Sequence, residues 1–174
     1  MAGADDPNAP AADPSPDSPI PNEQTAPTPT ELIEASPEAV FSVLVDPTTY
    51  PQWLVGARTI RRVDPDWPRV GSSFQHTIGW GPARIPGSTS VRRCRAPDEL
   101  ILSAGMGPLG EASVRFELER TADGTIVRIE ELPARGAVRV MWRLARPVVT
   151  AGLWGRNAVS LGSLADIVRS GGAG

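Results

Sequence analysis

The residues best suited to acid–base chemistry are one histidine, one tyrosine and one well-placed glutamate. His76 is the only histidine of the chain, and it lies in the alternating segment GSSFQHTIGW, residues 71–80. In a strand, Phe74, His76, Ile78 and Trp80 would share one face. Glu131 has the parity of Val127 and Ile129, so its carboxylate would also point to an apolar face. In an enzyme, His76 would act as the base, with Glu131 or Tyr50 as proton donor.

The same residues are compatible with roles that need no reaction. Burial disfavours the imidazolium cation, so a buried His76 would be neutral and would need one donor and one acceptor. Its ring could line a pocket, satisfy a hydrogen bond in the core, catalyse proton transfer or lie exposed. A His76–Glu131 contact would have to cross a cavity, because the two predicted strands are not expected to be neighbours. Pocket lining or a core hydrogen bond is the interpretation we favour.

Large aromatic side chains could form the apolar walls of such a pocket. The residues that we expect to line it, together with His76 and Glu131, are Trp53, Trp80, Phe116, Trp142 and Asn157. For Trp53 the simpler interpretation is core packing. One histidine and one cysteine, without clustered carboxylates, favour neither a metal site nor a cofactor.

Composition divides the chain into a tail and one domain. Residues 1–30 hold eight prolines, five acids and no basic residue, which predicts a disordered acidic tail. Residues 31–170 would form the folded domain, close to electrically neutral, and its scattered arginines argue against nucleic-acid binding. Cys94 is the only cysteine, which fits a reducing cytoplasm. No apolar run approaches the length of a membrane span.

The elements that would position these residues can be read along the chain. Ser36 and Pro37 have the types expected of a helix cap and first turn, and Asp46-Pro47 ends that helix and begins a second short one. A first strand would lie near residues 29–35. Period-two patterns predict further strands at 58–64, 72–80, 88–95, 99–105 and 111–120, with GPARIPG as a loop. Asp123-Gly124 predicts a hairpin turn into a last strand.

The C-terminal segment from about residue 137 to residue 170 predicts a long helix that Pro147 kinks or starts afresh. Its apolar stripe contains Val149, Leu153, Leu161, Leu164 and Val168. Asn157 falls in a gap of this stripe, so its amide would face the sheet and need a polar partner. Most arginines, including the group at 58–62 and 92–95, would reach solvent, with capture of an anionic ligand by Arg93 as the alternative.

Four segments resemble the START-like, or SRPBCC, superfamily in the correct order. They are ASPEAVFSVLVDPTTYPQW, WPRVGSSF, DGTIVRIEE and RNAVSLGSLADIV. The chain is most similar to the bacterial group described as polyketide cyclase/dehydrase-like. The resemblance implies an α+β helix-grip fold: a curved antiparallel sheet of about seven strands around a long C-terminal helix, with two short helices after the first strand.

The resemblance also implies a cavity between sheet and helix, where members of the superfamily hold lipids, sterols or aromatic polyketides. We therefore expect a cytoplasmic binder of a small hydrophobic molecule, without a cofactor. The alternative is an aromatase/cyclase that assists aldol dehydration through His76. A third hypothesis is a partner-binding module that uses the acidic tail. Fold alone does not decide among them, and oligomeric state stays open.

Overall fold

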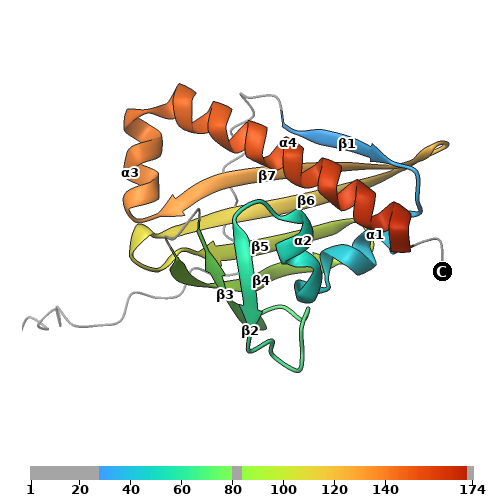
Figure 1. Ribbon diagram of the computed structural model, residues 1–174, viewed down its shortest axis with the longest axis horizontal. Coiled ribbons are helices and arrows are strands. Elements are labelled where there is room, and N and C mark those ends of the chain that lie inside the picture. Colours follow the sequence, from blue (N-terminus) through green and yellow to red (C-terminus); the bar gives the residue numbers. More distant parts are fainter. Residues whose placement is uncertain (1–27, 80–83, 172–174) are drawn as a thin grey trace, which may run out of the picture.

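A computed structural model describes residues 28–79 and 84–171 of the chain. Seven antiparallel strands form one curved sheet in the order β1-β7-β6-β5-β4-β3-β2 (Figure 1). The strands are β1 (Thr30–Ile33), β2 (Ala57–Arg61), β3 (Ser73–Ile78), β4 (Ile85–Arg95), β5 (Glu99–Gly105), β6 (Glu111–Thr121) and β7 (Gly124–Arg135). The sheet and the helix that crosses it have the predicted helix-grip architecture.

The helices gather on one side of the sheet. Two α-helices and a short 3-10 turn follow the first strand: α1 (Pro37–Leu44), η1 (Pro47–Thr49) and α2 (Tyr50–Trp53). A second turn, η2 (Gly107–Leu109), joins β5 to β6, and α3 (Ala137–Leu144) precedes the long α4 (Arg146–Gly171). Figure 1 shows α4 lying along the sheet with α3 turned away at its beginning.

The predicted helix signals are confirmed at the N-terminal end. The Ser36 hydroxyl accepts a hydrogen bond from the Ala39 N–H at 3.2 Å, which caps α1. Asp46 caps η1 through a 2.9 Å bond from the Thr48 N–H to its Oδ1. Pro147 lies in the first turn of α4, so it starts this helix instead of kinking it. Each cap satisfies N–H groups that a helix start leaves without partners.

The alternation in β6 directs one face of the sheet into the core. Ala112, Phe116 and Leu118 are buried there, and Leu100 of the neighbouring β5 lies opposite Phe116. The Asp123-Gly124 hairpin joins β6 to β7 as predicted. Gly124 has a φ of 141°, and a Cβ there would lie 2.2 Å from the Ile33 carbonyl oxygen. Only glycine fits this turn, because β1 passes so close to it.

Two strand boundaries differ from the prediction by three residues each. β2 ends at Arg61 instead of residue 64, and β4 begins at Ile85, inside the segment predicted to be a loop. Pro86 and Gly87 pair with β3, but β5 joins β4 only from Ser88 onward. The start of β4 is therefore a sheet edge, where proline and glycine are tolerated.

Most of the predicted tail, residues 1–27, lies outside the described residues, and its last residue, Thr30, begins β1. Disorder in this segment stays a prediction. Within the described part of the chain, no helix is long and apolar enough to span a membrane.

Candidate functional site

Helix α4 changes its surroundings near its middle. Its buried residues all lie from residue 157 onward, which we call the second half: Asn157, Ser160, Leu161, Leu164, Ala165 and Val168. In the first half, Val148 is 74% exposed and Trp154 is 45% exposed. Apolar side chains in the first half are therefore not buried in the core. Several polar side chains lie close together at the boundary between the halves, residues 156–157.

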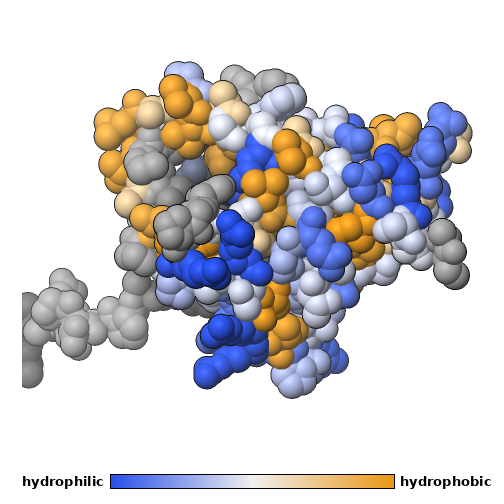
Figure 2. Space-filling view, in the orientation of Figure 1, coloured by the Kyte–Doolittle hydropathy of each residue, from blue (hydrophilic) through white to orange (hydrophobic). Residues whose placement is uncertain are grey.

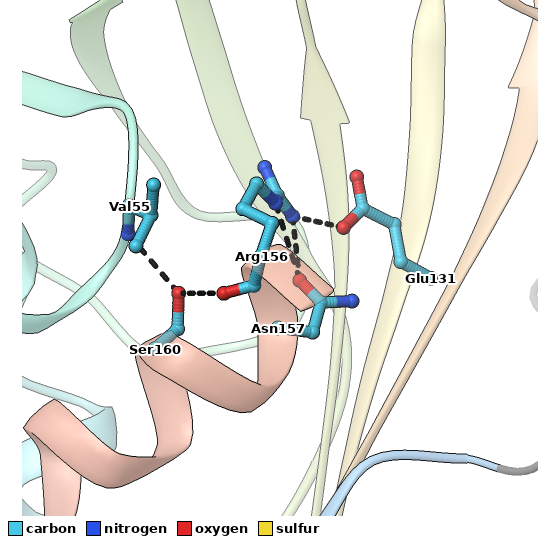
Figure 3. A network of polar contacts seen from close by, with 5 residues as sticks. All are labelled: Val55, Glu131, Arg156, Asn157 and Ser160. Atoms are coloured by element: carbon cyan, nitrogen blue, oxygen red, sulfur yellow. Dashed lines mark hydrogen bonds and ion pairs between the residues drawn. The ribbon is translucent and has the colours of Figure 1, made fainter. Parts of the chain in front are cut away.

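At that boundary an ion pair joins α4 to the concave face of the sheet (Figure 3). The Arg156 Nη2 binds the Glu131 Oε2, and the two side chains are 24% and 9% exposed, respectively. The guanidinium also donates to the Asn157 Oδ1, from Nη2 at 2.8 Å and from Nε at 3.2 Å. A carboxylate this buried requires a charged or multiply bonded partner, and Arg156 supplies it.

Ser160 fixes the position of the same part of α4. Its hydroxyl donates to the Arg156 carbonyl at 3.0 Å and accepts from the Val55 N–H at 3.1 Å. Figure 3 shows Val55 on the loop that follows α2, on the other side of the helix from Glu131. The helix is thus attached on two sides, immediately after its exposed half.

A groove of about 510 Å³ lies beside the exposed half of α4. Its lining is mostly apolar, and among the described residues Arg156 is the only charged one in it. The lining residues are Val55, Val149, Gly152, Leu153, Gly155, Arg156 and Val159. A concave apolar surface with a few polar groups at one end is the usual composition of a small-molecule site.

His76 lies on the concave face of β3 and makes its own local contacts. Its Nε2 is 3.1 Å from the Thr89 hydroxyl on the neighbouring β4. Burial lowers the pKa of His76, and a hydrogen bond with the Ser88 backbone opposes this shift. The ring lies against Gly87, where a Cβ would approach the His76 Cε1 to 2.8 Å. His76 is therefore held as a buried, neutral ring with partners on β4.

The three candidate acid–base groups make separate contacts. Glu131 is paired with Arg156, and His76 with Thr89 and Ser88. The Tyr50 hydroxyl donates to the Leu44 carbonyl at 2.8 Å. Burial, and to a lesser degree the charge of Asp46, raises the pKa of Tyr50. The rings of Tyr50 and His76 both pack against Phe74, but among the described residues no hydrogen bond or ion pair joins any two of these three groups. The geometry therefore assembles no acid–base pair from them.

The aromatic residues expected to line a pocket have different positions. Trp53 and Phe116 are each 2% exposed, and their rings pack edge to face at 6.1 Å in the core. The Trp53 Nε1 donates to the Thr49 hydroxyl at 3.0 Å. Trp80 lies outside the described residues. Trp142 lies in α3, and the structure does not describe its side chain.

A second, more polar hollow of about 720 Å³ lies at the ends of β3, β4 and β5. Arg135 and Glu111 line it and form an ion pair of 3.3 Å, and Gln75, His76 and Thr77 lie on its β3 wall, so His76 does line a hollow, as predicted. Thr77 Oγ1 is the one buried side-chain oxygen or nitrogen without a hydrogen-bond partner in the described part of the chain. The paired charges leave this hollow less suited to a hydrophobic ligand than the groove beside α4.

Arg156, Thr89 and Gly87 were not identified from the sequence. Arg156 had a detectable signal: it is an arginine in the middle of a helix that has no acidic residue before Asp166, opposite a strand with an inward glutamate. Gly87 had one as well, because a glycine inside a strand often marks the close approach of another group. Among the described residues, no three His, Cys, Asp or Glu side chains gather to hold a metal ion.

A family model described as Activator of Hsp90 ATPase homolog 1-like protein matches residues 34–163. No sequence among the curated proteins matches the chain. Among solved structures, protein NE0264 from Nitrosomonas europaea is 17% identical with a TM-score of 0.61, and the match covers 83% of this chain and 94% of that one. Protein SA2116 from Staphylococcus aureus is 11% identical with a TM-score of 0.65, covering 85% and 95%.

The di-domain ARO/CYC StfQ from the steffimycin biosynthetic pathway is 11% identical with a TM-score of 0.64. The match covers 84% of this chain and 52% of StfQ, so this chain spans about half of that protein. At these identities the similarity shows the fold alone.

Proposed function

Because the chain belongs to the Activator of Hsp90 ATPase homolog 1-like family, within the SRPBCC superfamily, we propose that it binds a small hydrophobic molecule. The site is the groove beside the first half of α4, whose lining includes Arg156, the residue that is bound to Glu131 and Asn157. The observation that carries the proposal is that α4 leaves its apolar first half unpacked beside this groove while its second half is sealed into the core.

The cluster defines the kind of molecule that fits. Arg156 keeps about a quarter of its side chain exposed although it is paired, so its guanidinium can donate one more hydrogen bond toward the groove. A ligand with an extended or polycyclic apolar body and one hydroxyl, carbonyl or carboxylate group matches both the apolar groove and the Arg156 guanidinium. Desolvation of the apolar body supplies the affinity, and the polar group fixes orientation.

The contacts of His76 do not favour the alternative of an acid–base enzyme. Its ring is already bonded to Thr89, and the carboxylate predicted to orient it, Glu131, is bound to Arg156. In the proposed function, His76 is a structural residue that ties β3 to β4. His76 lines the more polar hollow and not the groove beside α4, so it takes no part in the proposed site.

Binding can be tested by quenching of intrinsic tryptophan fluorescence with fatty acids, sterols and polycyclic aromatics. Trp154 is partly exposed on α4 near the groove and provides the signal. We expect saturable quenching by at least one of these classes. Native mass spectrometry of protein purified from its own host should show a retained small molecule.

Two variants of neighbouring residues locate the site. Gly152 lines the groove, and a Cβ built on it meets nothing within 4 Å, so Gly152→Phe fills the groove without a clash in the core. Ala151 is exposed and does not line the groove, so Ala151→Phe is the matched control. We expect the Gly152 variant to bind at least about tenfold more weakly and the control to bind as the wild type. Equal affinities of the two variants, or no quenching by any class, would rule the groove out.

A further inference from the structure

An exposed apolar surface with a basic border covers the turn between α3 and α4. Val140 is 57% exposed, Leu144 is 84% exposed and Val148 is 74% exposed; we call these three residues the elbow surface. Figure 2 shows hydrophobic residues gathered over α3 and the beginning of α4. Large apolar side chains this exposed and this close together indicate a surface that contacts something else.

The charged residues of the segment that carries the elbow surface have one sign. Arg139 and Arg143 are exposed on α3, four residues apart, next to the stripe formed by Val140 and Leu144. From residue 137 to residue 165 the sequence contains four arginines and no acidic residue. A helix with an apolar stripe beside a stripe of cations is the usual form of a segment that lies in the interface of a membrane.

We propose that the elbow surface docks the domain onto an anionic lipid bilayer. Leu144 and Val148 would enter the boundary between headgroups and acyl chains, and Arg139 and Arg143 would bind lipid phosphates. Each cation near an anionic surface strengthens such binding about fivefold. An acidic protein or a second copy of the chain matches these features less well, because exposed aliphatic side chains lie beside arginines in a segment, residues 137–165, that contains no acids.

The elbow surface lies next to the groove, so membrane docking would bring the groove close to the bilayer. Val148 immediately precedes Val149, which lines the groove beside α4. A hydrophobic molecule could thus pass between bilayer and groove without crossing much water. The docking itself does not depend on the proposed ligand, since a protein with an empty groove presents the same surface.

Co-sedimentation of the full chain with sucrose-loaded vesicles tests the inference. One set contains equal parts of phosphatidylglycerol and phosphatidylcholine, and the other contains phosphatidylcholine alone. We expect binding to the anionic set at about 0.1 M salt, clear weakening at about 1 M salt, and little binding to the neutral set. The absence of sedimentation with folded protein, or equal binding to both sets, would overturn the proposal.

Two pairs of variants identify the surface. Leu144→Glu with Val148→Glu should lower vesicle binding at least about tenfold, whereas Val70→Glu should leave it unchanged. Val70 is 62% exposed and lies between β2 and β3, outside the elbow surface. Arg139→Glu with Arg143→Glu should also abolish binding, and Arg92→Glu with Arg95→Glu, exposed arginines of β4, should not.

The controls decide between occupants of the surface. The substituted side chains are exposed, so the melting temperatures of the variants, followed by circular dichroism, should match that of the wild type. If the glutamates at 144 and 148 disturb the helices, the arginine variants still test the surface. Light scattering after size exclusion should show a monomer. A dimer that Val148→Glu dissociates, or loss of vesicle binding in the control variants, would overturn the membrane proposal.

Discussion

The two halves of α4 share one helix but have opposite relations to the sheet. From Asn157 onward, the inward side chains are almost fully buried, with Leu161, Leu164 and Ala165 at 0% exposure. Before Arg156, no described side chain of the helix is buried, although valine, leucine and tryptophan are all present. Helical geometry and apolar content are therefore not what separates the two halves. The two halves differ in burial because the sheet and α2 pack against the second half and not against the first.

The two halves of α4 have different roles: the second half stabilises the fold, and the first half provides the proposed binding surface. Buried leucines in the second half contribute the large apolar burial that holds a domain of this size together. The first half exposes similar side chains to a groove and to solvent, which costs stability and leaves apolar surface for a guest. The Arg156–Glu131 pair marks the border, because a charge pair is tolerated where one side is core and the other is open.

The largest expected contrast comes from leucine truncation on each side of the border. Leu164→Ala should cost about 2–5 kcal/mol of unfolding free energy, because it opens a cavity in the sealed half. Leu153→Ala should cost less than about 1 kcal/mol, because Leu153 is only partly buried beside the groove. Urea unfolding of both variants measures this. Equal losses would mean that the first half is packed as well as the second.

Removing the charge of Glu131 should give the next largest effect. Glu131→Gln leaves the Arg156 guanidinium without its carboxylate, which should cost about 1–3 kcal/mol. A double-mutant cycle with Arg156→Gln should show coupling between the two residues. Glu119→Gln, which breaks the exposed pair with Arg128, is the control and should change stability much less. If the double-mutant cycle shows no coupling energy, the Arg156–Glu131 pair does not stabilise the boundary between the two halves of α4.

Much of this border could be anticipated from the sequence. The cap at Ser36, the alternation of β6 and the Asp123-Gly124 turn predicted the fold, because each depends on local geometry. Glu131 and Asn157 were placed inward by period alone. The pairing of Glu131 with Arg156 could not be read this way, because it depends on how far α4 stands from β7, which is a property of the whole packing and not of either segment.

The same limit explains the aromatic residues and His76. Period-two alternation placed His76 on the concave face correctly, but its partner Thr89 depends on the register between β3 and β4. Trp53 was predicted both as a core residue and as a pocket residue, and the structure buries it in the core. A pocket forms where side chains of different elements do not pack against one another. The periodicity of hydrophobic residues within one segment does not show where this happens.

The pH dependence of stability should show that His76 belongs to the sealed part of the molecule. Its pKa is lowered in the fold, so between its unfolded value near 6.5 and the lowered value the unfolded state binds more protons. Stability should therefore fall as the pH drops below about 6.5, with a slope of at most about 1.4 kcal/mol per pH unit. Urea midpoints of the wild type and of His76→Asn, at several pH values, isolate this contribution. A parallel pH profile for the variant would contradict it.

The smallest predicted effect has the opposite sign. Gly152 and Gly155 lie inside the exposed half of α4, and a Cβ on either would meet nothing within 4 Å. Replacement of either glycine by alanine should raise stability by about 0.5–1 kcal/mol, because alanine favours the helix. Gly87→Ala, which would collide with the Gly105 carbonyl oxygen, should instead destabilise and serves as the comparison. Thermal melting distinguishes the two directions, and ligand titration shows whether the added methyl groups narrow the groove.

The short length of β1 has a consequence for self-association. β1 pairs only with residues 125–128 of β7, and a single further bond runs from the Ile129 N–H to the Pro29 carbonyl. Among the described residues, none forms a ladder with the rest of β7 on that side. Pro133 lies in this uncovered stretch and carries no N–H to offer. A foreign strand would therefore find an interrupted row of donors there, which disfavours edge-to-edge pairing at this edge of the sheet.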